Sequence, residues 1–196
     1  MTNVMRTTIV ALSFAASTLG AQATPAAPVA PAPAPNAADV AFMQGMIMHH
    51  GQAIEMVALI GTRTTNAVLK SLGERIDVSQ KDEIGMMRRW LREHHAAASA
   101  HEGMDMGDHP MLMPGMLTAA QMAALAKARG AEFDRLFLTG MIQHHEGAIT
   151  MVKELFATTG AAQPTDVFRF ASDVDADQRV EITRMRALLS TTARRK

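Results

Sequence analysis

In two short segments of the chain, a methionine is followed three and four positions later by two adjacent histidines. The residues concerned are Met46, His49, His50, Met141, His144 and His145. On a helix this spacing is about one turn, so the sulfur and at least one imidazole reach a common point. Thioether and neutral imidazole together suit a soft or borderline ion, above all Cu(I), with Ag(I) as its mimic. All six residues are therefore predicted metal ligands.

The geometry of a helix limits how the neighbouring histidines work together. Adjacent side chains diverge by about 100°, so one imidazole of each pair is expected to bind and the other to turn to a neighbouring helix or a second site. The alternative is that both copies are packing residues, because duplication preserves a core as well as a site. Asp39 and Asp134, two turns before each methionine, are expected in ion pairs or as charges at a helix start rather than as ligands.

The segment between the two phrases is a second candidate for metal chemistry. It contains Met104, Met106, His109, Met111, Met113 and Met116. A hydrophobic loop would normally bury Leu or Val, so five thioethers in a segment with Gly and Pro that is expected to be exposed indicate sulfur chemistry. The predicted role is a flexible segment that captures the ion for the bundle, and the alternative is a linker of biased composition. His94, His95 and His101 could add imidazoles, although an exposed helix end explains them nearly as well.

Several kinds of site are excluded by what the sequence lacks. Without cysteine there is no disulfide, thiolate zinc site, Cys-ligated iron–sulfur cluster, blue-copper site or thiolate nucleophile. Neither the Glu-x-x-His motif of di-iron bundles nor His-Glu-x-x-His occurs, and no Gly-rich phosphate loop follows a strand. The chain is predicted not to be an enzyme, and a copper- or iron-dependent redox enzyme is the weakest alternative. The 19 basic and 19 acidic residues balance, so no nucleic acid partner is expected.

The elements that carry these residues are duplicated. Residues 39–57 agree with residues 134–152 well beyond the histidines. The partner segments repeat as well, since Gln80, Glu83, Ile84, Met87 and Leu91 match Gln178, Glu181, Ile182, Met185 and Leu189. Aromatic residues are scarce while Ala, Leu and Met are abundant, a balance that favours helices over strands. Two duplicated helical hairpins predict an all-α four-helix bundle.

Apolar residues at helical spacing predict the individual elements. The long helices are expected at residues 36–60, 67–100, 131–158 and 165–192. Thr118 and Gln121 match a capping box, so a short extra helix is expected from there to about residue 130.

Details of the first hairpin also follow from the sequence. Gly61 is placed as a helix C-cap before a turn at residues 61–66, and Gly73 and residues 77–79 are positions where the second helix bends or breaks. Because the connection is short, the second helix returns antiparallel and brings its Met86, Met87 or Trp90 near Met43 and Met46 of the first helix. Met48 falls on the opposite side and is expected to be exposed.

The N-terminal part of the chain is predicted to be a targeting segment. A basic residue, an apolar run and a small-residue signature up to Ala23 predict a signal peptide over residues 1–23, and an uncleaved anchor is the alternative. Residues 24–36 are rich in Ala and Pro and are expected to be an extended spacer. The helical domain is then 37–192, with repeat one at 37–100, the Met/His linker at 101–117 and repeat two at 118–192.

Three parts of the sequence resemble one known family. The helices carrying residues 46–56 and 141–151, the phrase Met-Pro-Gly-Met-Leu-Thr at 113–118, and residues 133–137 are similar to the DUF305 family, over about residues 37–189. The resemblance implies an exported, ferritin-like four-helix bundle. For some members it also implies copper binding and resistance in the periplasm or outside the cell.

The sequence therefore predicts a periplasmic or secreted protein that buffers or transports Cu(I), or confers resistance to it, through Met and His. Expected partners are the metal ion and another copper-handling protein or a second copy of the chain. No membrane contact is expected once the signal peptide is cleaved. The alternative is a structural or protein-interaction bundle of the cell envelope that needs no metal.

Overall fold

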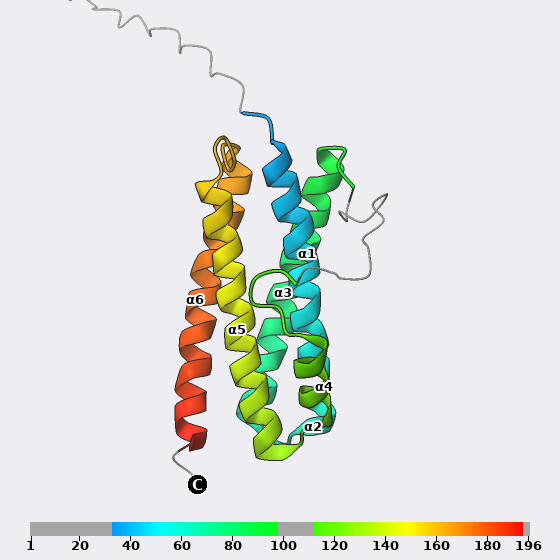
Figure 1. The fold of residues 1–196 in the computed structure, drawn as a ribbon, viewed down its shortest axis with the longest axis vertical. Coiled ribbons are helices and arrows are strands. Elements are labelled where there is room, and N and C mark those ends of the chain that lie inside the picture. Colours follow the sequence, from blue (N-terminus) through cyan, green and yellow to red (C-terminus); the bar gives the residue numbers. More distant parts are fainter. Residues whose placement is uncertain (1–32, 98–111, 194–196) are drawn as a thin grey trace, which may run out of the picture. The chain divides into compact units, whose positions relative to one another are not determined.

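Four long helices form the bundle in the computed structural model, which describes residues 33–97 and 112–193. Helix α1 (Ala37–Ala58) packs antiparallel on α3 (Ala67–Glu93), and α5 (Gly130–Ala157) packs antiparallel on α6 (Thr165–Ala193). The two hairpins meet chiefly through α1 and α5 (Figure 1). The described residues contain no strand, so the predicted all-α bundle of two hairpins is confirmed.

The N-terminus of α1 is capped by Asn36 and Asp39. Asn36 Oδ1 accepts from the backbone N–H of Asp39 at 3.0 Å, and Asp39 Oδ2 accepts from Asn36 N–H at 2.9 Å. This arrangement supplies acceptors for N–H groups that have no partner within the helix. It confirms that Asp39 acts at a helix start.

The two duplicated aspartates also join the hairpins at opposite ends of the bundle. Asp39 Oδ1 accepts from the N–H of Ala162, in the connection between α5 and α6, at 2.7 Å. Asp134 on α5 accepts at Oδ2 from the side-chain amide of Asn66, just before α3, at 2.8 Å. Each carboxylate therefore fixes the turn of the other hairpin, a role that the sequence did not indicate.

The first hairpin differs in detail from the sequence-based expectation. Gly61 is not a C-cap, because it lies within a short helix, α2 (Ile60–Arg63), and the chain turns only at residues 64–66. Helix α3 runs unbroken through Gly73 and residues 77–79, and it ends at Glu93 rather than near residue 100. A Cβ on Gly73 would lie 2.3 Å from Ile60 Cδ1, so this glycine allows α2 to approach α3 closely.

The apolar core consists of two clusters of buried side chains. Met46 and Trp90 belong to the first cluster, whereas Met141 and Phe137 belong to the second. The antiparallel return of α3 is as predicted, because Met43 of α1 lines the same cavity as Met86, Met87 and Trp90 of α3. Met48 is exposed, which confirms that it faces away from the core.

The short extra helix is also present, as α4 (Ala119–Lys127). Thr118 Oγ1 accepts from Gln121 N–H at 3.2 Å, and Gln121 Oε1 accepts from Thr118 N–H at 2.8 Å. The predicted capping box is therefore confirmed. The helix ends three residues before the expected residue 130 because Ala128 is already extended, and its Leu125 is buried in the second core cluster.

Residues 112–118 lie across α1 and α5 in a tightly defined path. Gln52 of α1 donates from Nε2 to Leu117 O at 2.9 Å and accepts at Oε1 from Leu117 N–H at 2.7 Å. Gly115 adopts a φ of +77°, which favours glycine. A Cβ on Gly147 of α5 would lie 2.0 Å from Pro114 O, so only glycine lets the loop backbone rest on the helix.

Gly147→Ala is expected to lift this loop from α5 and to lower the free energy of unfolding by about 1–3 kcal/mol, because the clash is with backbone atoms. Urea denaturation measures the change. Gly51→Ala on α1 is the matched control, since a Cβ there would meet nothing within 4 Å. The control should be neutral or stabilising by up to about 1 kcal/mol. Equal stability of the two variants would contradict the close contact.

Candidate metal centre

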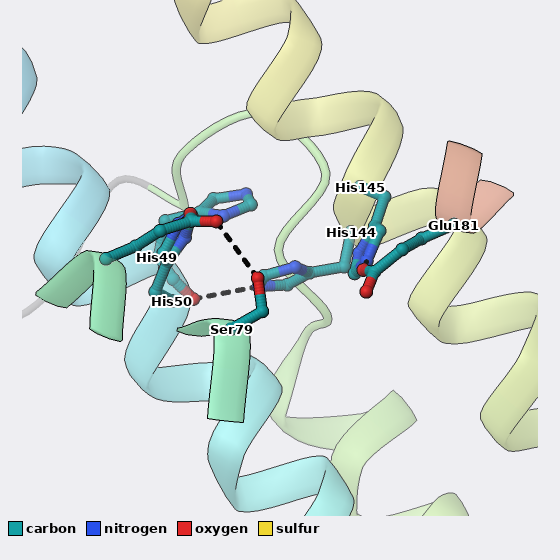
Figure 2. Close-up of polar contacts among 7 residues, drawn as sticks. His49, His50, Ser79, His144, His145 and Glu181 are labelled. Atoms are coloured by element: carbon teal, nitrogen blue, oxygen red, sulfur yellow. Dashed lines mark hydrogen bonds and ion pairs between the residues drawn. The ribbon is translucent and has the colours of Figure 1, made fainter. Parts of the chain in front are cut away.

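The four histidines form a buried layer between α1 and α5. His49 and His50 project from α1, and His144 and His145 project from α5 (Figure 2). The rings of His49 and His144 are in close, tilted contact, with centroids 3.8 Å apart and planes inclined by 38°. None of the four side chains has appreciable contact with solvent, at 1% exposure or less.

The outer histidine of each pair contacts a glutamate on the other helix of its own hairpin. His50 Nε2 lies 2.5 Å from Glu83 Oε2 on α3, and His145 Nε2 lies 2.5 Å from Glu181 Oε2 on α6. Ser79 Oγ also donates to Glu83, at 3.1 Å (Figure 2). The duplication therefore produces two equivalent His–Glu pairs. These contacts agree with the prediction that one of the two adjacent histidines on each helix turns to a neighbouring helix.

The inner histidines bind backbone carbonyl groups. His49 Nε2 donates to Pro114 O at 2.9 Å, and His144 Nε2 donates to His49 O at 2.8 Å. A carbonyl oxygen only accepts, so both rings carry their proton on Nε2 and a lone pair on Nδ1 when neutral. The Nδ1 atoms of all four histidines are buried and have no hydrogen-bond partner among the described residues.

Burial keeps the inner histidines neutral. Desolvation, with repulsion from a charge on His50, lowers the pKa of His49 from 6.5 to about 3. Desolvation is also the largest reason that the pKa of His144 lies well below its ordinary value, with His49 next. A neutral imidazole with an unprotonated Nδ1 is the form that a metal ion requires.

The described residues do not assemble a ready-made site from histidines and carboxylates. No group of three or more of these side chains in the described ranges is placed to hold an ion. Met46 and Met141 are fully buried and pack in different apolar clusters. The ligand roles of the two Met-His-His phrases stay predictions, and their use by a metal would require access to the interior.

The linker contributes two described methionines, Met113 and Met116, both half-buried. A Cβ built on Gly45 of α1 would lie 3.4 Å from Met113 Sδ and 3.4 Å from Met151 Cε of α5. Both thioether side chains therefore lie close to Gly45. The other predicted linker ligands lie outside the described residues: Met104, Met106, His109 and Met111.

One loop dipeptide connects this thioether pair to the histidine layer. Met113 covers Gly45, and the carbonyl of the next residue, Pro114, binds His49 one helical turn further along α1. The structure thus brings Met113 and His49, two predicted ligands, to neighbouring positions. It adds Met151, whose sequence signal was only its match to Met56 in the repeat. Glu83 and Glu181 were also missed, although both recur at equivalent positions of the duplicated partner helices.

Comparison with known families identifies the chain. Residues 39–189 match the family described as domain of unknown function DUF305. The chain belongs to the DUF305 family. A search of curated proteins finds no match.

Solved structures of other DUF305 proteins have the same fold. A Streptomyces coelicolor protein, which its name describes as secreted, is 29% identical with a TM-score of 0.68, over 80% of this chain and 94% of that chain. A Deinococcus radiodurans DUF305 fragment is 27% identical with a TM-score of 0.70, over 81% of this chain and 99% of the fragment. The Cu(II)-bound form of CopM is 28% identical with a TM-score of 0.61, over 78% of this chain and 96% of CopM. CopM has also been solved with Cu(I) and with Ag bound.

In the described part of this DUF305 protein, no helix is both long and apolar enough to cross a membrane.

The His–Glu pairs are expected to contribute to stability. Glu83→Ala or Glu181→Ala should each lower the free energy of unfolding by about 1–3 kcal/mol, because a buried imidazole N–H loses its acceptor. Denaturant titration measures both variants. Asp77→Ala is the control, since it removes an exposed pair with Lys81 and should change stability by less than about 1 kcal/mol. If all three variants changed the free energy of unfolding by similar amounts, the buried pairs would have no special structural role.

Stability should fall as the pH decreases from about 6.5 towards about 3. Over that range the unfolded chain binds a proton at His49 that the folded chain does not bind, because the folded pKa is about 3. One such group changes the free energy of unfolding by about 1.4 kcal/mol per pH unit. The His49→Gln variant keeps a donor for Pro114 but does not titrate. Its free energy of unfolding should therefore depend on pH less steeply, by the contribution of about one bound proton. An unchanged slope would contradict the neutral, buried imidazole.

Proposed function

We propose that this protein binds Cu(I), with Ag(I) as a mimic, and serves as a buffer or carrier of the ion outside the cytoplasm. The observation that carries the proposal is that two thioether side chains, those of Met113 and Met151, both lie against Gly45, one turn along α1 from the neutral imidazole of His49. Thioether sulfur and neutral imidazole nitrogen are preferred donors for Cu(I). The similarity to CopM, solved with Cu(I), Cu(II) and Ag, supports the same class of ion.

The residues present fit such an ion. The unpartnered Nδ1 of His49 is a lone-pair donor that no described hydrogen bond uses. Met113 and Met151 are half-buried, so these side chains are closer to solvent than those of the buried Met46 and Met141. In this proposal Met113, Met151 and His49 hold the ion. The capture segment supplies further donors, namely Met104, Met106, His109, Met111 and Met116.

The predicted signal peptide and the secreted relative support export, where thioethers survive conditions that oxidise thiols. A carrier must receive and release its ion, so another copper-handling protein or a second copy of the chain is the expected partner. The protein's own chemistry in this proposal is binding and exchange, without catalysis.

A structural bundle without a metal is the second candidate function. It is favoured by one observation: each of the four buried histidines has a protein partner for its Nε2 atom. In that case Cu(I) would leave the thermal stability unchanged under anaerobic, reducing conditions, since any ligand that prefers the native state raises it.

Anaerobic titration with Cu(I) against a competing chelator tests the metal proposal. Met113→Leu/Met151→Leu should weaken binding by about tenfold or more, while leaving the fold intact because Leu and Met have similar volumes. The comparison extends to the histidine layer with the double variants His49→Ala/His50→Ala and His144→Ala/His145→Ala. Replacing the linker methionines by Leu tests whether the linker captures the ion. Met48→Leu, an exposed methionine of α1, is the matched control. If wild type fails to bind, or if every variant binds as wild type does, the proposal is wrong.

A further inference from the structure

A second group of thioethers lies in the first hairpin, away from the linker. A cavity of about 250 Å³ there is bordered by α1, α3 and α6. Four residues of its wall, Met43, Met86, Met87 and Trp90, form what we call the thioether pocket. The volume is ample for an ion, since even a water molecule needs only roughly 10–15 Å³ of such space.

The thioether pocket combines a solvent-accessible donor with buried ones. Met86 is 42% exposed, whereas Met43 and Met87 are at most 2% exposed. An ion could therefore arrive at Met86 and be enclosed by the other two side chains. Three neutral sulfur donors favour a soft monovalent cation, and they offer little to Mg²⁺ or Ca²⁺, which require oxygen ligands.

The indole of Trp90 is held in place beside these sulfurs. Its Nε1–H donates to Asp166 Oδ2 at 2.8 Å, and its ring packs on the imidazole of His94 with centroids 4.4 Å apart. The face of an indole attracts cations through its quadrupole. A fixed Trp90 therefore adds a favourable aromatic wall to the three thioethers.

The charges around the cavity favour a cation. Among the described residues, the cavity is bordered by the carboxylates of Glu93 and Asp166 and by one basic residue, Arg89. The adjoining groove between α3 and α6, of about 670 Å³, shares Met86 with the pocket and is lined by Glu83, Asp166, Asp173 and Asp177, with Arg169 as its basic residue. An excess of carboxylates along a groove raises the local concentration of cations.

We propose that the thioether pocket is a second binding site for a soft monovalent cation, separate from the Met113–Met151 pair. The identity of the ion rests on the proposed function, but the location does not. Filling the two sites need not be coupled, because they share no ligand residue.

Silver titration followed by tryptophan fluorescence tests this site directly. Trp90 is the single tryptophan of the chain, so its emission reports an ion bound close to the indole. Because His94 packs on the same ring, a variant of the three methionines is needed to assign the response to the pocket. Adding Ag(I) in chloride-free buffer should quench the emission saturably, by about half or more, through the cation held against the indole. The Met43→Leu/Met86→Leu/Met87→Leu variant should need at least about tenfold more Ag(I) for the same quenching.

Two controls separate this site from the other one. Met48→Leu and Met113→Leu/Met151→Leu should both keep the Trp90 response, and total bound silver is measured in parallel by competition with a chelator. Quenching that survives in the triple variant, or that disappears in the Met113/Met151 variant, overturns the proposed pocket. Silver that binds wild type without changing Trp90 emission also overturns it but leaves the proposed function standing. Absence of any silver and Cu(I) binding overturns both.

Discussion

The bundle depends on finding acceptors for four imidazole N–H groups in its interior. A buried polar group without a partner costs about 1–3 kcal/mol, so four of them would consume much of the stability of a domain this size. The helices that carry the histidines offer only backbone groups that are mostly used within the helix. Two acceptors come from Glu83 and Glu181 on the partner helices, one from the linker at Pro114, and one from the carbonyl of His49.

This requirement connects parts of the molecule that are distant in sequence. The His–Glu pairs set the register of each hairpin, and the contact between His144 and the His49 carbonyl sets the two hairpins against each other. The Pro114 carbonyl attaches the linker to the same layer. The glycines at 115 and 147 then allow the loop backbone to lie directly on α5, and Met113 lies against Gly45 of α1, as Met151 does.

The soft donors are therefore divided between two settings. The Met-His-His phrases are buried and hydrogen-bonded, whereas the Met113–Met151 pair and Met86 lie nearer to solvent. Under the proposed function, this division suits a carrier, because an ion held by accessible thioethers can be exchanged without opening the core. The buried layer would then maintain the fold and position the nearest imidazole, His49, beside the thioethers.

Much of the fold could be predicted from the sequence because helical periodicity and internal duplication are local or repeated signals. They were sufficient for the four long helices, the two antiparallel hairpins, the Thr118 capping box and the exposure of Met48. The errors concern two glycines and some helix ends. Gly61 was expected to cap a helix and Gly73 to bend or break one, but both lie within helices, and α3 ends at Glu93 rather than near residue 100. Helix propensity is a weak preference, and Gly73 is where α2 packs closely against α3.

The candidate sites were only partly predictable, because local spacing and repetition show which residues are alike but not which residues come into contact. Sequence alone determined which residues have soft donor atoms and that His49 and His144 are equivalent. Only the tertiary structure decided that Glu83 and Glu181 bind the outer histidines, that Met113 and Met151 both lie against Gly45, and that Met43 and Trp90 share one cavity. These contacts join helices and loops far apart in the chain. Their partners depend on how the hairpins pack, which no local spacing records.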